Sequence, residues 1–148
     1  MKIQKVENID LESVRKLIAE VSEYDVLPKF NTQGKEAYRS NVLPSIDTTF
    51  NANEFTSIKA VIDNKIVGFG ALRSGNYLTH LFVSKSVQGK GIGKKLLATL
   101  LNSTDAQEIT LRASVNAVSF YRCNGFKTCG DESEFNGIRF VPMLLQRT

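Results

Sequence analysis

A glycine-rich and lysine-rich segment, SKSVQGKGIGKKLLATLL at residues 84–101, leads directly into an apolar pattern with helical spacing. The segment contains Gly89, Gly91 and Gly93 together with Lys90, Lys94 and Lys95. Without side chains at the glycines, successive backbone N–H groups at the helix start can face one anion. Lysines interact unfavourably with the positive N-terminal end of a helix when no ligand is bound there, but a bound polyanion makes their interaction favourable. We therefore predict an anion-binding loop; a flexible surface turn before a solvated basic helix is the alternative.

The loop does not have the spacing of the common nucleotide-binding motifs. Neither G-x-x-x-x-G-K-[ST] nor G-x-G-x-x-G occurs, and the run is Gln88-x-x-Gly91-x-Gly93 instead. His80 is the one histidine of the chain, which argues against a Ser-His-Asp triad and against a metal cluster. We expect a compact anionic ligand, no metal, and no covalent enzyme intermediate.

A second motif, NAVSFYRCNGF at residues 116–126, follows further along the chain. Together the two motifs resemble the pyrophosphate loop and the second signature of the GNAT superfamily of acetyl-CoA-dependent N-acetyltransferases, in which a helix carries a tyrosine four residues before Gly-Phe. The order of elements over residues 1–148 is similar to that family's. The resemblance implies a transferase that moves an acetyl group from the cosubstrate acetyl-CoA to a primary amine by direct attack.

The resemblance also implies which residues contact the cofactor. Backbone groups of Leu81, Phe82 and Val83 would lie along the pantetheine arm, and an amide near Val83 would polarise the thioester carbonyl. Main-chain groups of the loop would hold the pyrophosphate. The loop residues are Gln88, Gly89, Lys90, Gly91, Ile92, Gly93 and Lys94.

By the same resemblance, Tyr121 in Tyr121-x-x-x-Gly125-Phe126 would be the general acid for the leaving CoA thiolate. A tyrosine with a pKa of about 10 can protonate a thiolate of about 8.5 in a slightly uphill step. The alternative is a core tyrosine with a hydrogen-bonded hydroxyl. Family members often carry asparagine seven residues before the tyrosine, whereas this chain has Ser114 there and Asn116 two positions later. Either Ser114 or Asn116 contacts the cofactor, or the two residues cap the short helix.

The acceptor amine must lose a proton, so a base or a water relay is expected. His80 has an ordinary pKa of about 6.5, which suits a base, although a structural or exposed histidine is the alternative. Strand alternation puts His80 on the face opposite Leu81 and Val83, while Tyr77 and Thr79 share the face of those two residues. A bulge, which the family tends to have in this strand, would break that parity.

The acceptor pocket is less well specified by the sequence. We expect its walls to come from the first two helices, the loop IDTTFNANEF at residues 46–55, and the last hairpin. Arg139 and Phe140 are candidate lining residues, and Glu132 and Glu134 are either further bases or solvated charges. The acceptor is a small-molecule or peptide amine, and a homodimer through the C-terminal strands is compatible with the resemblance.

The surrounding elements predict an α+β (mixed α/β) fold in one domain over residues 1–148. Asp10 precedes a helix with apolar residues along one side, and a second helix is expected near residues 32–43. Three consecutive strands form an antiparallel meander, and strand, glycine loop, helix and strand form a parallel βαβ crossover. Further elements are a strand at 108–114, a short helix at 116–124 and a hairpin turning at residues 136–137. The sheet is thus mixed and mostly antiparallel, with flanking helices.

Composition excludes several other classes of protein. The chain has 148 residues, of which 42% are hydrophobic and 23% charged, as in a globular domain. Its first residues are too polar for a secretory signal and no long apolar run is present, so we expect a cytoplasmic protein that does not enter a membrane. Cys123 and Cys129 are expected to be reduced and at least half-buried.

Two other functions are weighed against the transferase. A net charge of +4 permits nucleic-acid binding, but residues 84–95 contain no aromatic residue, so we expect no nucleic-acid partner. A noncatalytic, acyl-CoA-binding regulatory module is the stronger alternative, because the same fold and loop would serve it.

Overall fold

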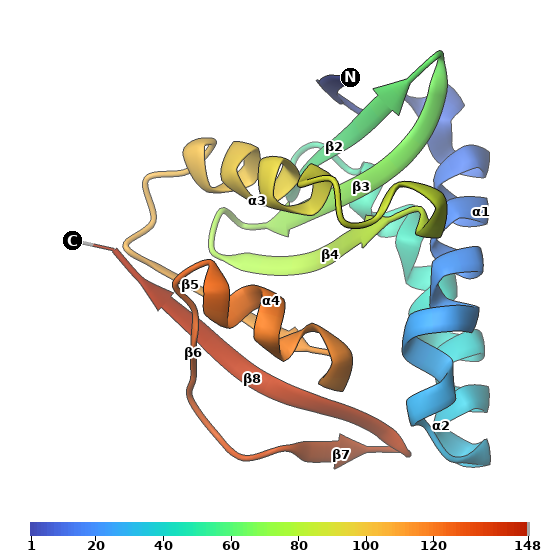
Figure 1. The fold of residues 1–148 in the computed structure, drawn as a ribbon, viewed down its shortest axis with the longest axis vertical. Coiled ribbons are helices and arrows are strands. Elements are labelled where there is room, and N and C mark those ends of the chain that lie inside the picture. The colour runs from blue at the N-terminus through green and yellow to red at the C-terminus, as the bar shows by residue number, and fades with distance from the viewer. Residues whose placement is uncertain (148) are drawn as a thin grey trace.

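The computed structural model describes residues 1–147, in which helices cover both faces of one mixed sheet (Figure 1). The strands are β1 (Lys2–Lys5), β2 (Phe55–Ile62), β3 (Lys65–Arg73), β4 (Tyr77–Val83), β5 (Glu108–Ala113), β6 (Lys127–Thr128), β7 (Ser133–Phe135) and β8 (Ile138–Gln146). The α-helices are α1 (Leu11–Val21), α2 (Thr32–Ala37), α3 (Ile92–Asn102) and α4 (Val118–Cys123). Shorter 3₁₀ and π-helical turns are η1 (Asn8–Asp10), η2 (Ser22–Val26), η3 (Leu27–Lys29), η4 (Tyr38–Val42), η5 (Leu43–Phe50), η6 (Lys85–Val87) and η7 (Val115–Ala117).

The sheet has the order β1-β2-β3-β4-β5-β8-β6, with β7 pairing to β8. Among the described strands, β4 and β5 form the one parallel pair, joined by the crossover through α3. The β2–β3 turn has positive φ at Asp63 and Asn64, as does the β7–β8 turn at Asn136 and Gly137, which suits tight hairpins. The predicted α+β class, the meander and the crossover are confirmed.

Each face of the sheet buries a separate apolar cluster. On one face, α3 packs Leu96, Leu97 and Leu100 against strand residues such as Ile58 and Leu111. On the other face, α1 packs Val14 and Ile18 against Phe69. The apolar stripe at i, i+3 and i+4 on α3 is why this helix lies flat on the sheet. The loop before α3 is thereby fixed at one end of β4.

A bulge in β4 decides which of its side chains lie on which face. Ala71 of β3 pairs with His80 and Leu72 with Leu78, so Thr79 is an extra residue in β4. Leu78, Leu81 and Val83 therefore contact the α3 face, whereas His80 stacks against Phe69 on the α1 face. His80 lies opposite Leu81 and Val83 as predicted, but the expectation that Tyr77 and Thr79 share their face is wrong, because the bulge resets the alternation.

Three local expectations need correction. The segment at residues 46–55, expected as a loop, is helical up to residue 50 as part of η5. The second helix is α-helical only over Thr32–Ala37 and continues as the π-helical η4. Cys123 and Cys129 are both exposed rather than half-buried. No helix within residues 1–147 is long and apolar enough to cross a membrane.

Candidate active site

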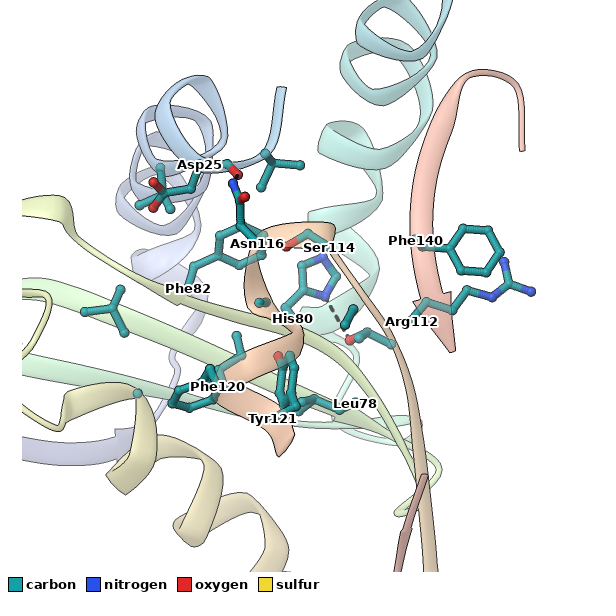
Figure 2. Close-up of a pocket in the computed structure, with 18 of the residues that line it drawn as sticks. Asp25, Leu78, His80, Phe82, Arg112, Ser114, Asn116, Phe120, Tyr121 and Phe140 are labelled. Atoms are coloured by element: carbon teal, nitrogen blue, oxygen red, sulfur yellow. Dashed lines mark hydrogen bonds between the residues drawn. The ribbon is translucent and has the colours of Figure 1, made fainter. Parts of the chain in front are cut away.

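A cavity of about 930 Å³ opens where β4 and β5 part, between α4, the N-terminus of α3 and the N-terminal helical segments (Figure 2). The predicted cofactor and catalytic residues that line it are His80, Leu81, Phe82, Val83, Gln88, Gly89, Gly91, Ile92, Gly93, Lys94, Ser114, Asn116 and Tyr121. Lys90 is exposed and is the one residue of the predicted cofactor loop that lies outside this lining. Residues from distant parts of the chain are thus brought to one space.

The separation of β4 from β5 leaves backbone groups without a strand partner. Pairing of these strands is limited to Tyr77 with Thr110 and Leu78 with Leu111. On the other side of β4, the Ser84 N–H donates to the Val67 carbonyl over 2.7 Å. Because antiparallel hydrogen bonds alternate along a strand, the polar backbone groups of residues 83 and 81 then face away from β3 and toward the separation. Buried backbone groups need partners, so this edge suits an extended polar ligand.

The glycine loop ends in a cradle at the start of α3. Gly89 has φ of 82° and Gly91 of 80°, and a Cβ added at either position meets no atom within 4 Å. Gly91 is the N-cap of α3, so the N–H groups of Ile92, Gly93 and Lys94 lie in the first turn, where no helical carbonyl is available to them. These donors, the helix dipole and the open space above the glycines suit an anion.

Asp25 of η2 connects the two sides of the cavity mouth. Its carboxylate accepts hydrogen bonds from Lys85 Nζ (2.8 Å) and Gln88 Nε2 (3.0 Å), and its carbonyl accepts from Asn116 Nδ2 (2.5 Å). Burial raises the pKa of this carboxyl, but the Gln88 and Lys85 hydrogen bonds outweigh burial and hold the pKa below its ordinary value. Sequence analysis missed Asp25, because its partners lie at least 60 residues away.

The two candidates near the start of α4 differ in their contacts. Asn116 is exposed and its amide is bonded to Asp25, as above. Ser114 is half-buried, lines the cavity and occupies the N-cap position of η7 without a side-chain capping bond. The side-chain capping alternative therefore does not account for Ser114, whose hydroxyl is available to a ligand.

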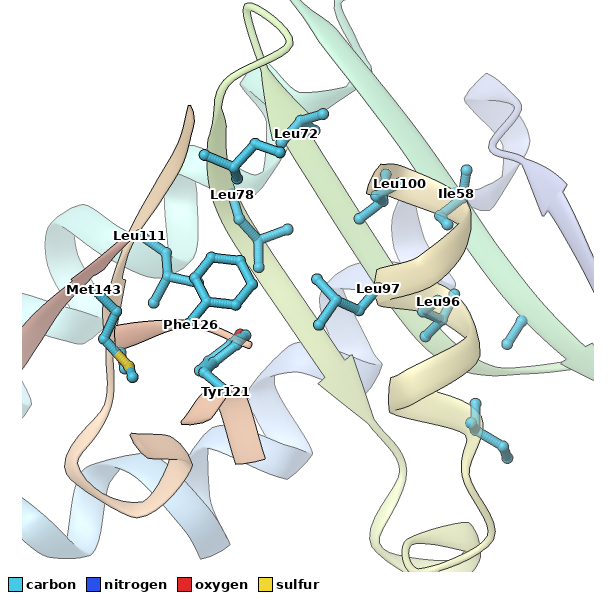
Figure 3. Close-up of a cluster of buried hydrophobic side chains, with 14 of the residues drawn as sticks. Ile58, Leu72, Leu78, Leu96, Leu97, Leu100, Leu111, Tyr121, Phe126 and Met143 are labelled. Carbon is cyan, nitrogen blue, oxygen red and sulfur yellow. The ribbon is translucent and has the colours of Figure 1, made fainter. Parts of the chain in front are cut away.

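Tyr121 belongs to the core cluster, where its ring packs edge-on against Phe126 at a centroid distance of 5.6 Å (Figure 3). Its hydroxyl is directed toward the side of the cavity on which His80 and Ser114 lie (Figure 2). Burial raises the pKa of this phenol well above its ordinary value of about 10, so the hydroxyl keeps its proton at any physiological pH. Full proton transfer from Tyr121 to a thiolate would thus be more strongly uphill than from an exposed tyrosine.

His80 lies half-buried between the rings of Phe69 and Phe82. The Thr79 hydroxyl donates to the Ala71 carbonyl (3.2 Å), so toward His80 Nδ1 (2.8 Å) its oxygen accepts. Nδ1 therefore carries the ring proton and Nε2 carries the lone pair. Burial lowers the pKa of His80 to about 4, which leaves the imidazole neutral at pH 7 and only weakly basic.

The side of the cavity away from the glycine loop is apolar. It is formed by the N-terminal helices and the last hairpin, which are two of the three segments expected to supply the walls of the acceptor pocket. Phe140 lines it, but Arg139 does not and pairs with Glu132 over 2.8 Å. Neither Glu132 nor Glu134 lines the cavity, so neither is placed to act as the base. The expected contribution from residues 46–55 is wrong, because η5 packs under α1 instead. Within residues 1–147 no three metal-ligating side chains come together.

Comparisons with known proteins agree on the fold. A GCN5-related N-acetyltransferase from Rhodopseudomonas palustris superposes with a TM-score of 0.81 at 17% identity, covering 98% of this chain and 94% of its own. The PaiA N-acetyltransferase from Thermoplasma acidophilum, solved with coenzyme A, has a TM-score of 0.74 at 22% identity, with 98% of each chain covered. The aminoglycoside 6'-N-acetyltransferase from Enterococcus faecium has a TM-score of 0.72 at 16% identity, and the match covers 99% of this chain and 97% of that chain.

At the sequence level, the chain is similar to a family model. Comparison with curated proteins gives no significant match. The model of the acetyltransferase (GNAT) domain matches residues 26–147, which contain the glycine loop, the separated strands and α4. The chain therefore belongs to the GNAT acetyltransferase family.

Proposed function

We propose that the chain transfers an acetyl group from acetyl-CoA to a primary amine by direct attack. The observation that carries this proposal is the separation of β4 from β5, with unpaired backbone groups on one side and Tyr121 on the other. Membership of an acetyltransferase family and the coenzyme A in the Thermoplasma acidophilum structure support it further.

The geometry of the loop and strand fits the cofactor. The open space over Gly89 and Gly91, beside the first turn of α3, suits the pyrophosphate, with Gln88 to Lys94 around it. The backbone of residues 81–83 suits the amides of the pantetheine arm, and the hydroxyl of Ser114 is a further donor or acceptor on the opposite side. Acetyl-CoA supplies the activated thioester, so no covalent attachment to the protein is required.

Two groups of the protein would then act on developing charge. A backbone N–H at or next to Val83 donates to the thioester oxygen as negative charge grows on it, and a fixed donor in a site without water stabilises that charge strongly. The Tyr121 hydroxyl donates to the departing sulfur. Because its pKa is raised, Tyr121 acts first as a hydrogen-bond donor, and proton transfer is completed as the thiolate forms.

On the acceptor side, His80 presents the Nε2 lone pair to the incoming amine. With a pKa of about 4 it is too weak a base to hold the proton of an ammonium ion, so its role is to accept a hydrogen bond and orient the neutral amine. The proton leaves through water in the open mouth of the cavity. Of the two sequence-based alternatives, the low pKa favours the water relay over His80 as the base.

The test is thiol release from acetyl-CoA with a panel of primary amines, for the wild type and Tyr121→Phe. We expect kcat to fall at least about 100-fold in the variant, since a general acid contributes 10²–10⁴-fold. Acetyl-CoA affinity should be unchanged, because phenylalanine keeps the ring packing. Equal kcat in both proteins would refute the acid role. Acetyl-CoA binding without thiol release from any amine would refute transfer and favour the acyl-CoA-binding regulatory module.

A further inference from the structure

We infer that the acceptor is a small primary amine carried on an apolar body, not a polycation such as a polyamine or an aminoglycoside. This inference rests on the proposed acetyl transfer and assigns the substrate class of the same site. It is argued from the lining of the cavity on the side away from the glycine loop. The aminoglycoside acetyltransferases of similar fold are 16–20% identical to this chain, so the likeness concerns the fold and does not decide the acceptor.

Aromatic side chains dominate this side of the cavity. Phe30 and Tyr38 pack together at a centroid distance of 5.8 Å, and Phe82 follows beside His80. The hydroxyl of Tyr38 is bonded to the buried Ser22 hydroxyl (2.9 Å). Tyr38 therefore offers its ring, and not a free polar group, to the cavity. Apolar walls of this kind bind apolar groups and give no partner to a second ammonium group.

The charged residues of the cavity lining also disfavour a polycationic acceptor. The charged lining residues within the described part of the chain are Asp25, Lys94 and Arg112. Asp25 already accepts from Lys85 and Gln88, so its carboxylate is not free for a cation. Arg112 stacks over the Phe140 ring at 4.7 Å and adds positive charge to the rim. Lys94 lies at the glycine loop, so on the acceptor side a polycation would meet the cation of Arg112 and no unpaired carboxylate of the lining.

Contact between α2 and the β7–β8 turn ties together two walls of the cavity. Gly34 and Gly137 approach so closely that a Cβ added at Gly34 would lie 2.0 Å from the Gly137 carbonyl oxygen. Residues that line the cavity lie on both sides of this contact. Tyr38 belongs to η4, and Phe135 and Ile138 belong to the β7–β8 hairpin. Walls tied together at this point leave no gap between α2 and the β7–β8 turn through which a polypeptide could pass, which favours a small molecule.

Phe135 supplies a second, independent observation. Its side chain lines the cavity next to the contact between α2 and the β7–β8 turn, yet the residue is 67% exposed, which is unusual for an aromatic residue of this size. An apolar acceptor would cover part of this surface. Phe135 is therefore the side chain at which specificity can be altered without disturbing the buried core.

The experiment compares n-alkylamines of increasing length with matched diamines, using thiol release from acetyl-CoA. Each added methylene should raise kcat/KM about three- to fourfold until the cavity is filled. Hexylamine should exceed 1,6-diaminohexane, which has the same length and one more ammonium group, by at least about tenfold. A flat or reversed order, with spermidine or kanamycin as the better acceptor, overturns this inference and leaves the proposed transfer intact.

A specificity variant adds a second readout. Phe135→Glu should shift the ratio of hexylamine to 1,6-diaminohexane activity about tenfold toward the diamine. The control is Ile9→Glu, which changes an 85% exposed apolar residue remote from the cavity lining and should leave the ratio unchanged. An unchanged ratio in Phe135→Glu overturns the inference.

Absence of thiol release with every amine refutes the proposed transfer separately. Calorimetric titration of hexylamine and of 1,6-diaminohexane into the protein saturated with CoA then still decides the inference. Tighter binding of hexylamine supports an apolar acceptor site, and equal or weaker binding overturns it.

Discussion

Replacing Gly91 by alanine separates the role of the glycine loop in folding from its role in binding. Gly91 has φ of 80°, in the left-handed region, where an added Cβ costs about 1–2 kcal/mol. No atom lies within 4 Å of the new Cβ, so no steric clash adds to that cost. For a chain of this size we expect the melting temperature to fall by about 3–6 °C.

The effect on cofactor binding should be much larger. The Cβ would occupy the space through which a phosphate oxygen must pass to reach the N–H groups of the first turn of α3. Loss of two hydrogen bonds to a charged group, at about 1.5 kcal/mol each, corresponds to roughly 100-fold weaker binding. Calorimetric titration with acetyl-CoA measures this change directly.

Gly75→Ala is the matched control, because Gly75 also has positive φ (74°) but does not line the cavity. It should lose at least as much stability as Gly91→Ala, because its added Cβ also meets Thr104 Oγ1 at 3.0 Å, and it should keep wild-type affinity for acetyl-CoA. With acetyl-CoA at 100 times its Kd, wild type and Gly75→Ala should both gain about 2.7 kcal/mol of stability, and Gly91→Ala should gain almost none. Affinity of Gly91→Ala within threefold of wild type would refute the assignment of the loop.

Three further predictions concern pH, packing and charge. Because the pKa of His80 is about 4, kcat/KM should rise with deprotonation of the acceptor amine and show no inflection near pH 6.5; an inflection there that His80→Gln removes would contradict the orienting role. Gly34→Ala should lower the free energy of unfolding in urea by about 1–3 kcal/mol, because its Cβ meets the Gly137 carbonyl at 2.0 Å, whereas Gln33→Ala on the exposed side of α2 should have little effect. The Asp10 carboxylate accepts a hydrogen bond from Lys59 Nζ (2.7 Å). Burial raises the pKa of Asp10, but the hydrogen bonds from Lys59 and from the Glu7 backbone outweigh burial, so the pKa is lowered. The stabilising contribution of the Asp10 carboxylate is fully present above the unfolded pKa of about 3.9 and is lost as the pH falls through the lower folded-state pKa. Asp10→Asn should therefore lose about 1–3 kcal/mol at pH 7, and its difference from wild type should shrink steadily as the pH falls below about 4.

The parts of the site that sequence analysis predicted are those specified by local rules. A glycine-rich turn followed by an apolar helical stripe predicts both the loop and α3, because turn and helix signals act over a few residues. The short helix with Tyr121 and the hairpin at Asn136–Gly137 were predicted in the same way. These features need no knowledge of what lies across the sheet.

The parts that could not be predicted depend on long-range pairing. The family resemblance already allowed for a bulge in this strand, but its position at Thr79 follows only from the pairing of β4 with β3. That position decides that Leu78 and Leu81 share a face. The Asp25 contacts join η2 to residues 60 or more positions away. The lowered pKa of His80 reflects its burial between two phenylalanines, which nothing in the sequence near position 80 signals.

The limited pairing of β4 with β5 also has a consequence for the cooperativity of unfolding. Strands β1 to β4 form one continuous antiparallel block and β5, β8, β6 and β7 another, and within the sheet two residue pairs join them. Native-state hydrogen exchange should therefore resolve two units with different opening free energies. A ligand lying between β4 and β5 would supply the missing hydrogen bonds and make the two blocks open together. Cofactor binding should then give the amides of both blocks the same opening free energy in the exchange experiment.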